Sequence, residues 1–188
     1  FYKMKNQLSR IVCLDIEGKP SLGKLCFKYS LAFEFDHNKI LEVGWVVYNL
    51  QDRLEEPHHI IITDYEHYCN GKYVYDNKEK FNFGSSQRLK LSVAIELLVK
   101  HLSQPSTCLL GHNIKSDINF LSQFTSHKIP VPVFDTLAIF KYHTLSQEPA
   151  SLARVLDGLE IPYSNLHNAG NDAYYTLKAF IKLAQLDQ

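Results

Sequence analysis

Three short segments, far apart in the chain, supply four carboxylates and one histidine, and bringing them together constrains the fold strongly. They are Asp15-Ile16-Glu17, residues 111–117 (Gly-His-Asn-Ile-Lys-Ser-Asp) and residues 167–172 (His-Asn-Ala-Gly-Asn-Asp). Four acidic side chains at one point repel one another, so a fold keeps such a cluster mainly to hold divalent cations. The histidine before the last aspartate is a candidate proton acceptor. The set therefore indicates metal-dependent cleavage of a phosphodiester.

The size and composition of the chain predict one globular domain over residues 1–188. The 188 residues suffice for a sizeable core, and 45% of them are hydrophobic and 21% charged. Because the sequence begins at Phe1, we expect a fragment of a longer polypeptide. No run of about eighteen apolar residues occurs, so no membrane partner is expected. Four scattered cysteines favour reduced buried thiols and an intracellular location, in the cytoplasm or nucleus: Cys13, Cys26, Cys69 and Cys108.

The charge balance limits how the chain can bind nucleic acid. Twenty Lys and Arg residues match twenty Asp and Glu residues. This balance argues against a protein that coats nucleic acid through a broad basic face. It is compatible with an enzyme that grips a few nucleotides at one end through bound metal.

Hydrophobic patterning predicts an α/β fold with a mixed five-stranded sheet flanked by helices. The expected strands are 10–16, 40–48, 58–63, 107–111 and 131–134. The expected helices run from Ser85 or Ser86 to about 103, with Leu89, Val93, Leu97 and Leu98 facing the core, and then over about 114–125, 136–143, 150–159 and 168–186. Residues 64–84 are interpreted as a long ordered loop.

The acids fall where such a sheet can bring them together. Asp15 and Glu17 end the first strand, and alternation points both carboxylates to the same side. Asp117 lies in the first turn of a helix for which Asn113 is a plausible cap, and Asp172 lies on the last helix. These positions converge at one sheet edge. Taken singly, each segment also has a plain structural interpretation, as solvated acids, a first-turn acid or a helix cap, and His112 is interpreted as a structural hydrogen-bond partner.

Together, the three segments resemble the three exonuclease motifs of the DEDDh family, within the RNase H-like superfamily. Asp15 and Glu17 match the first motif, and Asp117 in Gly-His-Asn-x-x-x-Asp matches the second. His167 and Asp172, in His-x-Ala-x-x-Asp-Ala, match the third, where tyrosine in place of histidine would indicate the sister group. Residues 133–137 (Val-Phe-Asp-Thr-Leu) resemble the segment between the second and third motifs, and the resemblance spans about residues 10–185.

This resemblance implies an RNase H-like fold and a 3′–5′ exonuclease that uses two Mg²⁺ or Mn²⁺ ions and releases nucleoside 5′-monophosphates. By resemblance, Asp15 would bridge both ions, while Glu17 and Asp172 would hold the ion that carries the attacking water. Asp117 would support the second ion, and His167 would accept the proton of the water. All five residues would then be catalytic, and the four acids would be the metal ligands.

Three further segments resemble a fungal subgroup of this family. They are Asp76-Asn77-Lys78, residues 81–85 (Phe-Asn-Phe-Gly-Ser) and residues 165–172. The subgroup includes factors linked to mRNA export through a DEAD-box helicase and proteins that assist Argonaute-based silencing. It implies a single-stranded nucleic-acid substrate, RNA over DNA, and an RNA helicase or silencing complex as partner. A catalytically weak or inactive binding module, acting in mRNA export or RNA silencing, stays open as the alternative.

Residues 18–31 depart from the family pattern, and we interpret them as a basic insert beside Glu17. The insert is either a flap that contacts the phosphate backbone of the nucleic acid or a tolerated loop. Part of the insert matches G-x-x-x-x-G-K, but Leu25 replaces the Ser or Thr of a P-loop and Pro20 removes a backbone donor, so no P-loop is predicted. Nearby aromatic residues either stack bases or pack the 64–84 loop onto the core: Tyr65, Tyr68, Tyr73, Tyr75, Phe81 and Phe83.

Overall fold

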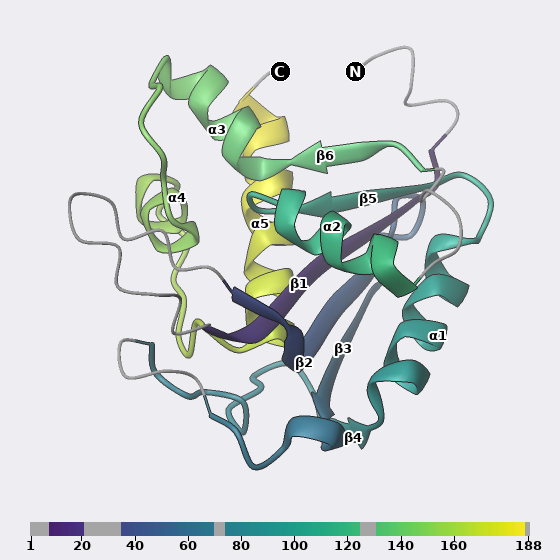
Figure 1. Ribbon diagram of the computed structural model, residues 1–188. Helices are drawn as coiled ribbons and strands as arrows, with labels where there is room; N and C mark the ends of the chain where they lie inside the picture. Colours follow the sequence, from purple (N-terminus) through teal and green to yellow (C-terminus); the bar gives the residue numbers. More distant parts are fainter. Residues whose placement is uncertain (1–7, 21–34, 70–73, 125–130, 187–188) are drawn as a thin grey trace.

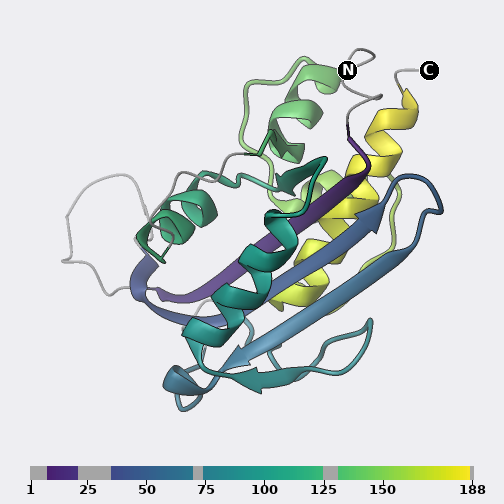
Figure 2. The same cartoon turned by 90° about the vertical axis from the view of Figure 1, so that its right-hand side faces the viewer.

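Strand β1 (Arg10–Pro20) lies inside a six-stranded mixed sheet (Figures 1 and 2). The computed structural model describes residues 8–20, 35–69, 74–124 and 131–186. The strand order is β4-β3-β2-β1-β5-β6. The other strands are β2 (Phe35–Asn49), β3 (Glu55–Ile62), β4 (Gln87–Leu89), β5 (Thr107–Gly111) and β6 (Val133–Asp135). Strand β2 runs antiparallel to β1 and β3, whereas β5 is parallel to β1 and β6. The predicted mixed α/β sheet is therefore confirmed.

Helices cover both faces of this sheet. They are η1 (Thr63–Tyr65), α1 (Leu91–Leu102), α2 (Lys115–Phe124), α3 (Thr136–Thr144), α4 (Leu152–Gly158) and α5 (Ala169–Leu186). Helices α1 and α2 pack on one face, and α5 packs on the opposite face with α3 and α4 beside it (Figures 1 and 2). Among the described helices, none combines the length and apolar character needed to cross a bilayer.

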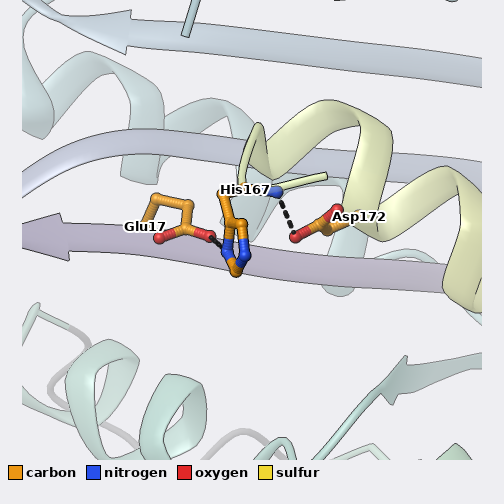
Figure 3. A group of neighbouring side chains, drawn as sticks. All are labelled: Glu17, His167 and Asp172. Atoms are coloured by element: carbon orange, nitrogen blue, oxygen red, sulfur yellow. Dashed lines mark hydrogen bonds and ion pairs between the residues drawn. The ribbon is translucent and has the colours of Figure 1, made fainter. Parts of the chain in front are cut away.

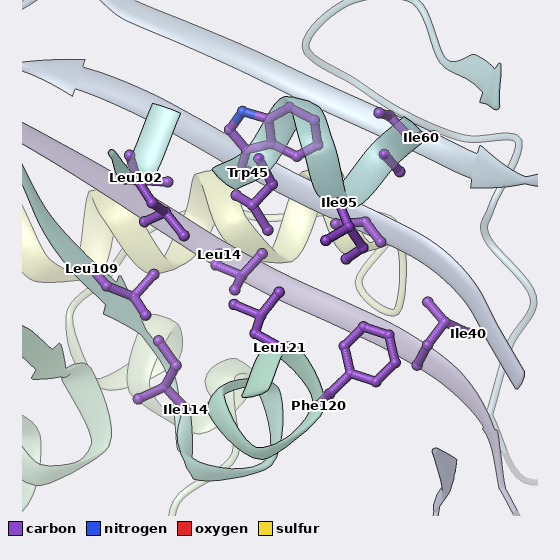
Figure 4. Close-up of a cluster of buried hydrophobic side chains, with 14 of the residues drawn as sticks. Leu14, Ile40, Trp45, Ile60, Ile95, Leu102, Leu109, Ile114, Phe120 and Leu121 are labelled. Atoms are coloured by element: carbon purple, nitrogen blue, oxygen red, sulfur yellow. The ribbon is translucent and has the colours of Figure 1, made fainter. Parts of the chain in front are cut away.

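Side-chain alternation along β1 explains its apolar sequence. Val12 and Leu14 point into the core formed with α1 and α2, where Figure 4 labels Leu14, whereas Ile11 and Cys13 point into the core formed with α5. All four are buried, so the strand is apolar on both faces until the acids begin at Asp15. The carboxylates therefore start where the two cores end.

Gly44 allows α5 to approach the sheet closely. It pairs with Asp15 across β1 and β2, and a Cβ atom there would lie 2.1 Å from the backbone carbonyl of Ala169 and 2.2 Å from the nitrogen of Gly170. Backbone atoms at these distances cannot move aside without shifting the whole start of α5. The sequence of β2 thus fixes how near the third acidic segment comes to the first.

We predict that Gly44→Ala destabilises the folded state by about 1–3 kcal/mol or more, because it overpacks this contact. A lower midpoint of urea unfolding at unchanged slope would report the loss. Gly158→Ala is the matched control, since its Cβ would meet the Phe140 ring at an ordinary 3.4 Å. Equal unfolding midpoints for Gly44→Ala and the wild type would contradict the close approach.

Several predicted boundaries were wrong. Residues 87–89 form β4, parallel to β3, so the sheet has six strands and α1 begins only at Leu91. The buried positions of α1 are Ala94, Ile95, Leu98 and Leu102, whereas Val93 is exposed. Strand β1 continues to Pro20, which pairs with Phe35 after register shifts that begin at Glu17. Residues 18–20 therefore continue β1, and residues 21–31 of the predicted insert lie outside the described part of the chain.

The aromatic residues of the 64–84 segment mostly pack inward. Tyr65 contacts the α1 core, and the Phe83 ring stacks on Tyr174 of α5 with centroids 3.6 Å apart. Tyr75 is 85% exposed, and Tyr73 lies outside the described residues. The packing interpretation is confirmed for Tyr65 and Phe83. Of the cysteines, Cys13 and Cys108 are buried and free, Cys69 is exposed against prediction, and Cys26 lies outside the described residues.

Candidate functional site

The first two acidic segments meet where β1 loses one of its neighbours. Its parallel pairing with β5 ends at Cys13 and Leu110, while its antiparallel pairing with β2 continues. The loop after β5 and the first turn of α2 fill the open edge. A pocket of about 150 Å³ lies there, lined by Asp15 and Glu17 from β1 and by Asp117 from α2. The predicted convergence of these three acids is present in the fold.

Helix α5 brings the third segment to Glu17 from the opposite face of the sheet. The backbone N–H of His167 donates to Asp172 Oδ2 at 3.0 Å, and His167 Nδ1 lies 3.7 Å from Glu17 Oε1 (Figure 3). Ligand atoms of Glu17, His167 and Asp172 all lie within 4.8 Å of one another. Glu17 belongs to both groups, so the five predicted residues form one continuous site.

Burial and mutual repulsion raise the pKa values of the acids. Burial raises the pKa of Asp15 well above its usual value, and the charges of Asp172, Glu17 and Asp117 raise it further. Burial, followed by the charge of Glu17, raises the pKa of Asp172 to about 8. Burial raises the pKa of Asp117 to about 7, although hydrogen bonds, including one from the Ser116 hydroxyl, oppose the shift. The cluster therefore resists full ionisation unless a positive charge joins it.

Two buried carboxylate oxygens identify where such a charge fits. Asp15 Oδ2 and Asp172 Oδ1 have no hydrogen-bond partner within the described part of the chain. Buried polar atoms normally have partners, and oxygen ligands are those that Mg²⁺ and Mn²⁺ favour. The donor set, the unpartnered oxygens and the raised pKa values together fit bound divalent cations.

The raised pKa values predict that the metal-free protein loses stability as the pH rises. Aspartate in an unfolded chain has a pKa of about 4, against about 8 for folded Asp172 and about 7 for folded Asp117. The folded state binds these protons more tightly, so the stability that they contribute is complete below about pH 4 and is lost as the pH rises through about 7–8.

We therefore expect a higher Tm in EDTA at about pH 5.5 than at about pH 8.5, with Mn²⁺ restoring much of the loss at the higher pH. Thermal scans by circular dichroism measure this, and Asp172→Asn should reduce the difference. Equal Tm values at both pH values in EDTA would contradict the raised pKa values.

Glu42 is a buried acid at this site that the sequence prediction missed. It pairs with Glu17 across β1 and β2, and its Oε2 accepts from the backbone N–H of Ala169 at 3.2 Å. The same oxygen lies 2.9 Å from His59 Nε2, and His59 Nδ1 lies 2.8 Å from Ser86 Oγ. Burial raises the pKa of Glu42 and lowers the pKa of His59 to about 4, so both neutral forms are favoured. Glu42 thus ties β2 to the first turn of α5.

The residues around the second motif are structural. His112 Nε2 donates to the carbonyl of Ala150 at 2.9 Å, and Nδ1 lies 2.9 Å from Thr136 Oγ1, which confirms the predicted structural role. Asn113 does not cap α2, because the helix begins two residues later and Asn113 adopts a left-handed φ of 54°. Its backbone N–H instead donates to Asp135 Oδ1 at 2.8 Å.

Comparison with known proteins agrees with this geometry. The DEDDh family model described as "DNA polymerase III subunit epsilon-like, C-terminal domain" matches residues 30–183. That span contains Asp117, His167 and Asp172, whereas Asp15 and Glu17 precede it. The chain belongs to the DEDDh exonuclease-like family.

Solved structures of exonuclease I have the same RNase H-like fold. One has a TM-score of 0.64 at 14% identity, and the match covers 95% of this chain and 41% of that chain. The zinc-bound complex of Escherichia coli exonuclease I with single-stranded DNA has a TM-score of 0.59 at 16% identity, covering 96% and 41%.

Curated relatives are fungal, as the subgroup resemblance predicted. An uncharacterized nucleolar protein of Schizosaccharomyces pombe is 31% identical over 180 residues, covering 90% of this chain and 72% of the relative. "Good for full DBP5 activity protein 2" of Saccharomyces cerevisiae is 26% identical over 223 residues, covering 98% and 37%. The chain thus spans most of the first relative and little more than a third of the second.

Proposed function

We propose that this chain is a metal-dependent 3′–5′ exonuclease that hydrolyses phosphodiester bonds at the 3′ end of single-stranded nucleic acid and releases nucleoside 5′-monophosphates. The observation that carries the proposal is the convergence of four carboxylates from β1, α2 and α5, two of which have a buried oxygen without a partner among the described residues. Membership of the DEDDh family and the exonuclease I fold support it.

The residues divide into metal ligands and a proton acceptor. Asp15, Glu17, Asp117 and Asp172 would hold divalent ions, with Mg²⁺ and Mn²⁺ both suited to carboxylate oxygen ligands. When bound, such ions would activate the attacking water and neutralise charge on the phosphate. His167, whose side chain is 50% exposed beside the acids, would take the proton of that water. We assign this role to Nε2, because Nδ1 faces Glu17.

Besides the acids, two buried core side chains, Ile40 and Phe120, form part of the wall of the pocket. RNA is proposed over DNA, on the subgroup resemblance and on the relative named for DBP5 activity. A nuclear location is proposed from the nucleolar relative.

A test of polarity and product uses single-stranded RNA labelled at its 3′ end, with a DNA oligonucleotide of the same sequence in parallel. We expect labelled nucleoside 5′-monophosphate as the first product in Mg²⁺ or Mn²⁺, and faster release from RNA. Early loss of nucleotides from the 5′ end, or internal cuts in an oligonucleotide blocked at its 3′ end, would contradict the proposed reaction.

A second candidate is a catalytically weak or inactive module that binds RNA or recruits a partner. The name of the S. cerevisiae relative favours it, because that protein is named for the full activity of another protein. The partner would be an RNA helicase or a silencing complex, in mRNA export or RNA silencing. Retention of all five site residues favours the enzyme. Folded protein that binds single-stranded RNA and yields no product with either metal would support the module instead.

A further inference from the structure

The loop before α5 carries His167 in a backbone conformation that needs outside support. Asn165 has a φ of 53° and His167 a φ of 63°, both in the left-handed region. Asparagine and histidine adopt this region more readily than other residues with a Cβ atom, but the conformation still has a cost and persists where the surroundings fix it. The position of the imidazole therefore depends on what packs against residues 164–168.

The segment 77–82, which is distant in sequence, supplies that support through asparagine side chains. Asn77 Nδ2 donates to the carbonyl of Leu166 at 2.6 Å, directly beside His167 in the chain. Asn165 Nδ2 donates to Asn82 Oδ1 at 2.9 Å. Asn77 is only 8% exposed, so water competes little for the hydrogen bonds of its side chain. Both bonds act on the left-handed part of the loop.

Two fully buried asparagines join the same segment to the start of α5. Asn168 Nδ2 donates to the carbonyl oxygens of Asn77 at 3.0 Å and Lys78 at 3.2 Å, while its Oδ1 accepts from the backbone N–H of Asn171 at 3.0 Å. Asn171 Nδ2 donates to the carbonyl oxygens of Lys80 at 2.9 Å and Asn165 at 3.0 Å. Its Oδ1 accepts from the backbone N–H of Asn82 at 2.9 Å.

The chemistry of this network suits its place beside the acids. A carboxamide can both donate and accept, which a carboxylate cannot do, and it adds no charge. An aspartate at the same positions would leave carbonyl groups without donors and would add negative charge beside Glu17 and Asp172. Neutral amides are the side chains that can fix this loop without strengthening the repulsion within the site.

We propose that five asparagines form a brace that positions His167 over the carboxylate cluster: Asn77, Asn82, Asn165, Asn168 and Asn171. The brace fixes the chain before His167 through Leu166 and after it through Asn168, while the hydrogen bond to Asp172 fixes its own N–H. The proposal rests on the proposed exonuclease function, because it takes His167 as the proton acceptor. The five are positioning residues and contact no reacting atom.

Asn77→Ala tests the brace with little other disturbance. It removes the donor to Leu166, whereas the backbone oxygen of residue 77 still accepts from Asn168. Misplacement of a catalytic group commonly costs up to about 10²-fold in rate, so we expect kcat to fall about 10–10²-fold with KM within about twofold. Asn49→Ala is the matched control. It also loses one hydrogen bond between a side chain and the backbone, but at the end of β2 that lies away from the site, so it should keep the wild-type rate.

A double variant separates positioning from general loss of stability. With His167→Ala already present, Asn77→Ala should lower kcat no further, because no imidazole remains to be misplaced. Independent, multiplying effects would overturn the brace, as would Asn77→Ala with wild-type kcat. If Asn77→Ala does not fold, Asn165→Gly serves instead, since glycine adopts the left-handed φ readily and only the bond to Asn82 is lost.

Hydrogen exchange distinguishes failure of the brace from failure of the proposed function. The amides of residues 165–168 should exchange faster in Asn77→Ala, with the core of β1 unchanged. Faster exchange in a protein whose wild type cleaves nothing would leave the brace in place as a loop-holding device and reject the exonuclease. Unchanged exchange would overturn the brace, whatever the wild-type activity.

Discussion

Asp15→Asn is expected to lower the exonuclease rate by about 10³-fold or more and to make the metal-free protein more stable. Asp15 lies at the centre of the cluster, where burial and four neighbouring acids raise its pKa. Asparagine keeps the shape of the side chain but removes a negative ligand. Loss of metal-based charge stabilisation of about 4 kcal/mol corresponds to about 10³-fold in rate. The gain in Tm in EDTA reflects relief of repulsion.

Asp52→Asn provides the matched control for this prediction. Asp52 is an exposed turn residue whose Oδ1 accepts from the N–H of Leu54, a bond that asparagine can also make. Turnover and Tm should stay at their wild-type values. Degradation of RNA by Asp15→Asn at the wild-type rate would remove Asp15 from the site. A lower Tm for Asp15→Asn than for the wild type in EDTA would show that the charge of Asp15 does not destabilise the metal-free protein by repulsion.

His167→Ala is expected to lower kcat by about 10²–10⁴-fold, the contribution typical of a general base, with little change in KM. Metal binding should persist, because the four acids and not the imidazole are the proposed ligands. Single-turnover rates and calorimetric titration with Mn²⁺ measure the two effects separately. Since the side chain is half exposed, added imidazole should recover part of the rate.

His67→Ala is the control for the histidine prediction, because His67 is exposed and lies outside the site. It should retain the wild-type kcat. A folded His167→Ala protein with full turnover would show that His167 is not the proton acceptor. Loss of Mn²⁺ binding together with turnover would instead make the imidazole a metal ligand.

The sequence was sufficient to predict that the five residues come together, because their positions follow local rules. Val12 and Leu14 alternate with Ile11 and Cys13 into two cores, so an apolar run marks the central strand and its acids mark where the cores end. The first turns of α2 and α5 then place Asp117 and Asp172 by helix position alone.

Contacts between residues that are far apart in the sequence could not be predicted from these local rules. Asn77 and Leu166 are joined only by the fold, and the sequence showed their segments as separate matches to one subgroup. β4 was mistaken for the start of a helix because three residues carry little periodicity and their strand character comes from the edge of β3. Glu42 did leave a signal, since an acid inside the apolar run 40–48 requires a buried partner.

The central claim is most directly tested with 5′-labelled single-stranded RNA incubated with the folded protein in Mg²⁺, Mn²⁺ or EDTA. A ladder of products shortened from the 3′ end is predicted with either metal. No ladder is predicted in EDTA, or with Asp15→Asn or Asp172→Asn in any of the three conditions. Intact RNA after incubation of the wild type with both metals, or equal ladders from the wild type and Asp172→Asn, would contradict the claim.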